Sequence, residues 1–205
     1  MFNRVMLVAL VSIPLLCLAG CGEQPQQASQ PAVAPASPPA KAPEPPVQVY
    51  ELTKDDITSH KDWTSRNISI LGVKLGDETR KVEKNLGNVE NARTLPEDYL
   101  TVYQGNGLFV YTVKLTGKAR KFEVYSTFAK KIADTKLQKL LYGGDLKYMR
   151  ELFGMEEGVV ENTEDVPNAT EYSYDSRGFR FVKFKVGGGK ILNALRFSEM
   201  KKSTT

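Results

Sequence analysis

Residues 75–87 read LGDETRKVEKNLG and residues 142–154 read YGGDLKYMRELFG, so one pattern occurs twice at an offset of 67 residues. Each segment contains an aspartate near its start, apolar residues four apart and a glycine at its end. Asp77 or Asp145 can cap the first amides of a helix, and the final glycine is a frequent helix stop. The two segments therefore predict two short helices, and their fixed offset is typical of an internal repeat.

Each predicted helix is followed by aromatic residues that alternate with polar ones around a glycine. Residues 99–111 read YLTVYQGNGLFVY, and residues 172–181 read YSYDSRGFRF. Alternation of this kind around Gly107 or Gly178 predicts a β-hairpin, because glycine readily adopts the positive φ values of tight turns. A further glycine-containing turn and a third strand are expected after each hairpin.

The repeats predict an α+β fold of two tandem units, residues 49–125 and 126–205. Each unit is expected to contain a helix, a loop and a three-stranded antiparallel sheet. Neither sheet would be well buried alone, so we expect the two units to fold as one body. Outside the repeats, Asp134 is expected to cap a linking helix, and a short helix is expected to hold Ile57 and Trp63.

Residues 1–20 have the features of a signal peptide. Arg4 supplies a positive charge, and the apolar run that follows is shorter than a membrane-spanning helix requires. The sequence LAGC at 18–21 resembles the bacterial lipobox, in which a lipid is attached to the cysteine before the signal is cleaved. We therefore predict acyl chains on Cys21, with an ordinary secretory signal and an incidental cysteine as the alternative.

Residues 21–48 are predicted to be the lipidated cysteine followed by a disordered tether. Eight of the 11 prolines of the chain lie in this segment, and proline at that density prevents helix formation and sheet pairing. We interpret it as a passive spacer, with a proline-rich ligand as the alternative. Because Cys17 would be removed with the signal, the mature domain would have neither a disulfide nor a cysteine nucleophile.

The sequence offers few residues for catalysis or metal binding. His60 is the only histidine, and neither a catalytic triad nor a zinc site has its other members in context, so we expect an exposed histidine in a polar stretch. Residues 187–190 read GGGK but lack the Ser or Thr of a phosphate-binding loop, which predicts a flexible hairpin turn. The acidic segment 156–171 is expected to be a solvated loop, with calcium binding as the alternative.

The charge of the chain does not predict a nucleic-acid partner. The formal net charge is +4 and falls to +3 once Arg4 is removed with the signal. Basic residues alternate with aromatic ones, as in FVKFK at 181–185, which is typical of a strand with one solvated and one buried face. A weak attraction to anionic lipid headgroups or cell-wall polymers is the alternative.

The helix and hairpin pattern is similar to that of a known family. The helix with Val82, Leu86 and Gly87, followed by the hairpin with Tyr103 and Gly107, resembles the SmpA/OmlA (BamE-type) domain of an outer-membrane lipoprotein in β-barrel assembly. Two such units in tandem resemble the fold of the β-lactamase inhibitor protein. The resemblance implies a partner-binding surface and no catalytic residue.

The same resemblance implies that the exposed concave face of the sheets, with its loops, binds the partner. The residues expected to take part are Tyr103, Asn106, Tyr174 and Arg177, since tyrosine and arginine are frequent anchors of protein interfaces. Packing within turns and sheets is the alternative role for each of the four.

These observations together predict a lipid-anchored envelope protein that binds another protein and is not an enzyme. Its acyl chains on Cys21 would hold it in a bacterial membrane, and Gly22 after the cysteine resembles the sorting signal for the outer membrane, with the domain facing the periplasm. Outer-membrane assembly or integrity is the process that the family resemblance implies. The alternatives are an inhibitor of a periplasmic hydrolase and a carrier of an apolar ligand; no cofactor or nucleic acid is expected.

Overall fold

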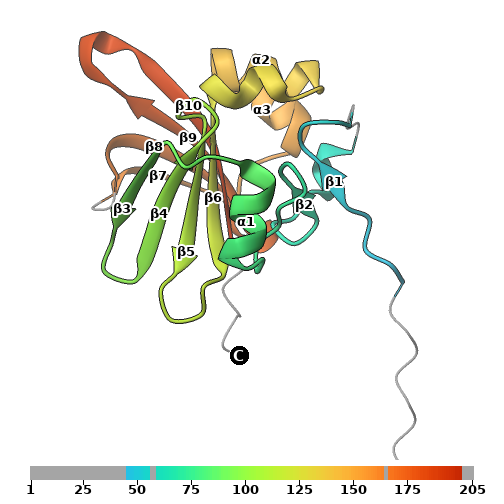
Figure 1. Cartoon of the computed structure of the whole chain (residues 1–205). Coiled ribbons are helices and arrows are strands. Elements are labelled where there is room, and N and C mark those ends of the chain that lie inside the picture. Colours follow the sequence, from blue (N-terminus) through green and yellow to red (C-terminus); the bar gives the residue numbers. More distant parts are fainter. Residues whose placement is uncertain (1–44, 56–58, 164–165, 200–205) are drawn as a thin grey trace, which may run out of the picture. The chain divides into compact units, whose positions relative to one another are not determined.

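A computed structural model of the chain describes residues 45–55, 59–163 and 166–199 (Figure 1). The predicted signal peptide, Cys21 and the tether up to residue 44 lie outside these ranges. Residues 45–48, at the end of the predicted tether, are exposed and belong to neither a helix nor a strand.

Eight strands form one antiparallel sheet in the order β3-β4-β5-β6-β10-β9-β8-β7. Their bounds are β3 (Asn91–Thr94), β4 (Asp98–Tyr103), β5 (Leu108–Val113), β6 (Ala119–Tyr125), β7 (Gly158–Thr163), β8 (Val166–Tyr174), β9 (Phe179–Lys185) and β10 (Ile191–Ser198). Each half of the sheet is a meander, and the halves join where β6 pairs with β10. Phe122 lies opposite Phe197 at this join, and Val124 lies opposite Leu195.

The prediction of two tandem units with three strands each is wrong. The strands of both halves belong to a single sheet, and each half has a fourth strand, β3 or β7, at its outer edge. β3 has the sequence NART and all its residues are exposed, so it lacks apolar alternation. β7 lies in the acidic segment that was expected to be a loop. Both edge strands are held by backbone pairing on one side, and their side chains carry little of the pattern that reveals a strand.

Three α-helices, a short parallel strand pair and four 3-10 turns complete the described fold. Their bounds are α1 (Thr79–Leu86), α2 (Thr135–Gly143), α3 (Leu146–Phe153), β1 (Tyr50–Glu51), β2 (Ile68–Ser69), η1 (His60–Asp62), η2 (Ser126–Lys131), η3 (Asp175–Arg177) and η4 (Gly187–Gly189). The short helix expected around Trp63 is absent: η1 ends before Trp63, Lys54 lies in a turn, and Ile57 lies outside the described residues.

The helices begin and end where the sequence provides caps, with one exception. Asp145 accepts hydrogen bonds from the amides of Lys147 and Tyr148 and so caps α3, as expected. Asp77 does not cap α1, because Glu78 is the N-cap residue and the carboxylate of Asp77 accepts from the amide of Lys74. Both helices end at a glycine with positive φ, 83° at Gly87 and 87° at Gly154.

The helices lie on one side of the sheet and enclose the core with it (Figure 1). Trp63 is 0 % exposed, and its ring centre lies 5.8 Å from that of Phe153 on α3 and 6.4 Å from that of Phe197 on β10. Since these three side chains come from the N-terminal segment, a helix and the sheet, the core packs all three parts together.

His60 is buried, contrary to the expectation of an exposed histidine. Its side chain is 4 % exposed, its ring centre lies 5.1 Å from that of Trp63, and its Nε2 lies 2.6 Å from the carboxylate of Asp134. Asp134 also caps α2, as predicted, by accepting from the amides of Lys136 and Leu137. Burial alone would raise the pKa of Asp134, but the close contact with His60 and the hydrogen bonds from the helix amides outweigh burial and hold the pKa below its ordinary value.

We predict that Asp134→Ala lowers the free energy of unfolding by about 3 kcal/mol, because it removes a helix cap and leaves the His60 imidazole buried without its partner. Asp145→Ala is the matched control, since this exposed aspartate caps α3 without a histidine partner, and its loss should cost about 1 kcal/mol. Guanidinium unfolding of both variants measures the difference. Equal losses would show that the His60 contact contributes nothing.

Candidate functional site

The face of the sheet opposite the helices carries the candidate site. Side chains on a strand alternate between two faces, and those that alternate with the core residues point to this second face, here called the open face. Its central residues are Asp98, Leu100, Val102, Phe109, Tyr111, Lys121, Glu123, Tyr125, Glu171, Arg180, Val182, Phe184, Ala194, Arg196 and Ser198. The helices of the described residues pack against the other face (Figure 1).

A network of ion pairs crosses the open face at the join of the two halves. Arg196 on β10 donates through Nε to Glu123 on β6 at 2.9 Å and through Nη1 to Glu171 on β8. Glu171 also accepts from Nη1 of Arg180 at 2.7 Å. The Glu123 and Glu171 side chains are only 4 % and 3 % exposed. Each arginine is therefore held in a fixed position by a buried carboxylate.

Aromatic side chains extend the network across the open face. The ring of Tyr125 lies 4.7 Å from that of Phe109 and 5.9 Å from that of Phe184, measured between centres. The hydroxyl of Tyr125 donates to Glu123 at 2.7 Å. All three rings are partly exposed. Apolar and charged groups therefore lie next to each other on a face that stays accessible.

The protonation states in the network follow from its partners. Burial alone would raise the pKa of Glu123, but the charges of Arg196 and Lys121 and the hydrogen bond from Tyr125 outweigh burial, so the pKa lies below its ordinary value. Burial and the Glu123 carboxylate both raise the pKa of the Tyr125 and Tyr111 hydroxyls. At neutral pH the network thus holds an ionised carboxylate and protonated tyrosine donors.

A β-bulge aims two successive cations at the open face. Lys121 lies opposite Tyr111 while Ala119 lies opposite Thr112, so Arg120 is an extra residue in β6. The ammonium of Lys121 lies 3.5 Å from the centre of the Tyr111 ring. Bulges commonly redirect side chains in this way beside functional sites.

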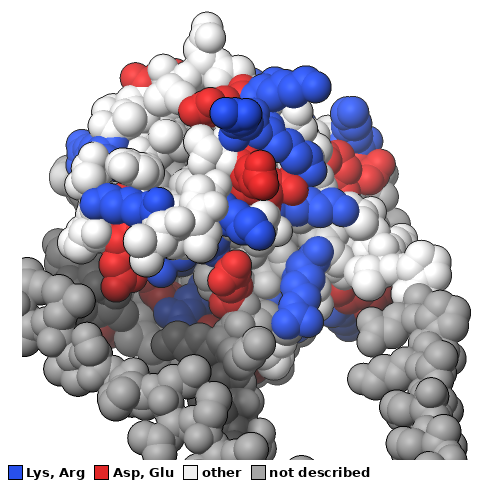
Figure 2. All heavy atoms as spheres, turned by 60° about the horizontal axis from the view of Figure 1, so that its bottom comes forward, with Lys and Arg blue, Asp and Glu red and all other residues white. Residues whose placement is uncertain are grey.

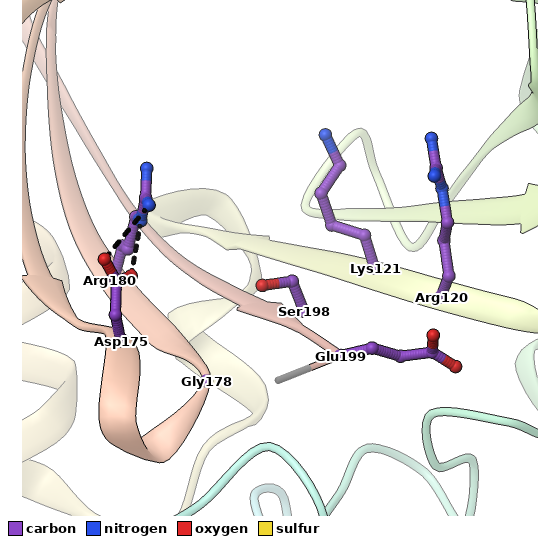
Figure 3. Close-up of a pocket in the computed structure, with 7 residues that line it drawn as sticks. All are labelled: Arg120, Lys121, Asp175, Gly178, Arg180, Ser198 and Glu199. Atoms are coloured by element: carbon purple, nitrogen blue, oxygen red, sulfur yellow. Dashed lines mark hydrogen bonds and ion pairs between the residues drawn. The ribbon is translucent and has the colours of Figure 1, made fainter. Parts of the chain in front are cut away.

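Two adjoining hollows open on this face and share Arg120 and Lys121. One, of about 640 Å³, is lined by Leu95, Pro96, Glu97, Asp98, Tyr111, Arg120, Lys121, Glu123, Tyr125, Phe184 and Arg196. The other, of about 520 Å³, is lined by Arg120, Lys121, Asp175, Gly178, Arg180, Ser198 and Glu199. Figure 3 shows the side chains of Arg120, Lys121 and Arg180 extending to the same side of the sheet. Together the hollows form a site with a cationic end and an aromatic end.

Two of the four predicted binding residues lie in the core. Tyr103 and Tyr174 are 1 % and 0 % exposed, and the Tyr174 hydroxyl donates to the carbonyl of Gly154 at 3.0 Å. Both tyrosines point to the helix-covered face, so neither presents surface to a partner in this fold. Asn106 is exposed in the turn between β4 and β5, where its φ is 58°.

Arg177, the fourth, connects three parts of the fold. Its guanidinium donates to the carbonyls of Lys61 and Phe153, both at 2.7 Å, and lies 4.8 Å and 4.7 Å from the ring centres of Tyr174 and Phe179. These contacts join the β8–β9 turn to η1 and α3, which is the packing role that was the alternative for this residue.

The charged residues at the centre of the network were missed by sequence reasoning. Glu123 lies between Phe122 and Val124, and Arg196 lies between Leu195 and Phe197. A charge between two core residues on a strand must point to the opposite face, which is the signal that could have placed them there. Their pairing across 73 residues of sequence has no local signal.

The acidic segment 156–171 is not a solvated loop. It contains β7 and most of β8, and Glu171 is buried against Arg180 and Arg196. Glu156 accepts two hydrogen bonds from Arg150, so this carboxylate also has a basic partner. Within the described ranges, no group of three or more acidic, histidine or cysteine side chains is placed to hold a metal ion. Those ranges also contain no helix both long enough and apolar enough to span a membrane.

Comparison with known proteins does not support the predicted family. No protein-family model matches the chain, and no curated protein matches its sequence. The crystal structure of a DUF4309 family protein (YjgB) from Bacillus subtilis subsp. subtilis str. 168 is similar with a TM-score of 0.40 and 11% identity, over 60% of this chain and 79% of that chain. The expected SmpA/OmlA membership is wrong, because the fold is one eight-stranded sheet rather than tandem units of that type.

We predict that Glu123→Gln lowers the free energy of unfolding at pH 7 by about 3 kcal/mol, because it removes a buried carboxylate from Arg196. The folded-state pKa of Glu123 lies below its ordinary value of 4.5, so its contribution is complete above that value and is lost as the pH falls through the folded-state pKa. The difference between the two proteins should therefore shrink in acid. Urea unfolding from pH 7 to pH 3 measures it.

Glu97→Gln is the control for this series, since the Glu97 side chain is 78 % exposed and lies 3.5 Å from Arg120. Its unfolding curve should match that of the wild type at every pH. A Glu123→Gln difference that stays constant down to pH 3 would contradict the assignment of an ionised, paired Glu123.

Proposed function

We propose that the chain is a lipid-anchored protein of the bacterial envelope and that its open face binds another protein without catalysis. The observation that supports this proposal is the arrangement of the open face. Arginine side chains and Tyr125 are fixed there by hydrogen bonds to buried carboxylates, Tyr125 packs against the rings of Phe109 and Phe184, and all these side chains remain partly exposed. Such side chains contribute most of the binding energy in protein interfaces, and their fixed positions reduce the entropy that binding costs.

The hydrogen bonds that Glu123 and Glu171 accept favour a binding role for the open face over acid–base catalysis. One oxygen of Glu123 accepts from Arg196 and the other from Tyr125. Both oxygens of Glu171 accept from arginines, one from Arg196 and one from Arg180. A general base needs a lone pair directed at a substrate proton, whereas these oxygens are directed at the protein's own donors.

The anchor and its tether are proposed from sequence. The lipobox at 18–21 favours acylation of Cys21, and two or three acyl chains hold a protein in a membrane almost permanently. The 27 residues from 22 to 48 are rich in proline and would span roughly 80 Å if fully extended. This reach would let the domain meet a partner at a distance from the membrane that holds the anchor.

A photoreactive residue in place of Phe184 tests the binding face in living cells at the native level of expression. We expect ultraviolet light to give one discrete adduct with an envelope protein, because Phe184 lies in the aromatic part of the open face. The control is the same residue in place of Tyr142, which is 53 % exposed near the end of α2. An adduct from Tyr142 alone, or none from Phe184, would refute the proposal.

The anchor has a matched test within the signal region. Cys21→Ala should abolish incorporation of radioactive palmitate, because the acylated residue is gone, while Cys17→Ala should leave incorporation unchanged. Fluorography of the immunoprecipitated protein reads both. Labelling that survives in Cys21→Ala would contradict the lipobox assignment.

A further inference from the structure

We propose that the open face recognises one carboxylate of its protein partner, which binds between Lys121 and Ser198, with an apolar partner residue in the adjoining aromatic hollow. This inference rests on the proposed function and names the chemistry that the face selects. The expected ligand is a loop or strand of a protein with aspartate or glutamate next to an apolar side chain.

The charges of the open face are arranged in two layers. The carboxylate side chains of Asp98, Glu123 and Glu171 are 6 %, 4 % and 3 % exposed and form the lower layer. The side chains of Arg120 and Lys121 above them are 41 % and 28 % exposed. Toward the centre of the hollows a partner therefore meets these cations before the buried carboxylates beneath them.

Among the cations that line the hollow of about 520 Å³, Lys121 has the fewest close partners for its hydrogen-bond donors. Its ammonium can donate three hydrogen bonds, but within the described residues it has only the Glu123 carboxylate at 3.5 Å below and the Tyr111 ring at 3.5 Å. The arginines are better occupied, since Arg120 pairs with Asp98 and Arg180 with Glu171 and Asp175. Lys121 can therefore accept a new anionic partner without breaking a close ion pair.

Ser198 supplies a second donor at the same place. It lies directly opposite Lys121 on the neighbouring strand, so the two side chains share the open face. Both line the hollow of about 520 Å³, and Figure 3 shows the two side chains between Arg180 and Arg120. A partner carboxylate that enters this hollow can take a hydrogen bond from the ammonium on one oxygen and from the hydroxyl on the other.

The rim of the hollow favours a single negative charge over a phosphate or an anionic membrane. Glu97, Asp175 and Glu199 line the two hollows at their edges, and the first two are 78 % and 58 % exposed. Figure 2, viewed from this end of the domain, shows acidic side chains between the basic ones. A doubly charged phosphate or a charged bilayer would meet these carboxylates, whereas one partner carboxylate can reach Lys121 between them.

The neighbouring hollow suits an apolar residue. Leu95, Pro96, Tyr111, Tyr125 and Phe184 contribute apolar surface to its lining, and it meets the first hollow at Lys121. A side chain next to the bound carboxylate would therefore enter an aromatic environment. Burial of one such side chain adds about 1.5–3 kcal/mol, which is enough to make the neighbour of the carboxylate part of the recognised sequence.

The experiment is a selection of peptides on the immobilised full-length chain in detergent, with a phage-displayed library of random dodecapeptides as the probe. We expect the selected peptides to share an aspartate or glutamate beside a phenylalanine, tryptophan or leucine. Lys121→Gln should weaken their binding at least tenfold, measured by fluorescence anisotropy, and Ser198→Ala should weaken it two- to fivefold. Lys121→Arg should restore most of the loss, because it keeps the charge.

Lys118→Gln is the matched control, since this exposed lysine near the start of β6 lines neither hollow. The Lys118→Gln variant should bind the selected peptides with the affinity of the wild type. Thermal unfolding of each variant confirms that it is folded. Should Lys121→Gln not fold, Ser198→Ala decides alone. The inference would be overturned if Lys121→Gln and Lys118→Gln bound the peptides with equal affinity. It would also be overturned if the selected peptides lacked a carboxylate, or if no peptide were selected.

A second arm distinguishes a lipid headgroup from a protein carboxylate. We expect the wild type and Lys121→Gln to bind vesicles with 30% phosphatidylglycerol equally. Weaker vesicle binding by Lys121→Gln would overturn the inference in favour of a lipid headgroup. The in-cell adduct at Phe184 separates the two proposals. An adduct together with peptides that lack a carboxylate leaves the proposed function standing, while absence of the adduct removes the function itself.

Discussion

The contact of Arg196 with Glu123 and Glu171 ties the two halves of the sheet together on the open face. It connects β10 to β6 in one half of the sheet and to β8 in the other, so it spans the join. Buried ion pairs repay their loss of hydration only in well-formed geometry, and a shift of one residue in either strand would turn these charges into the core. The network thus favours one register for the strands that it connects, β6, β10, β9 and β8.

The same contact explains how side chains of the open face can be accessible to solvent and still be held in fixed positions. An uncovered sheet face with mobile charged side chains would lose much entropy on binding. Here Glu123 and Glu171 fix the arginines from below, and Tyr125 connects the charged part to the rings of Phe109 and Phe184. Under the proposed function the same residues would provide stability and recognition, so substitutions in the network are expected to change both.

The sequence predicts the local elements better than their assembly. The aspartate and glycine of residues 142–154 place α3 correctly, and aromatic alternation places the hairpins of β4–β5 and β8–β9. The edge strands β3 and β7 were missed because exposed side chains carry no alternation, and β6–β10 pairing joins distant segments. His60 and the tyrosines Tyr103 and Tyr174 were misplaced for one reason: polar neighbours in sequence do not show which distant side chains cover a residue.

The most direct test is an experimental structure of the full chain with the partner that is proposed to bind its open face. We expect the partner to bury Phe184, Tyr125 and Lys121 and to leave α1, α2 and α3 in solvent. We also expect Arg196 to keep both of its carboxylate contacts in the complex, since the face is already formed. A partner that lies against the helices, or along the edge strand β7 with the open face still in solvent, would contradict the proposal.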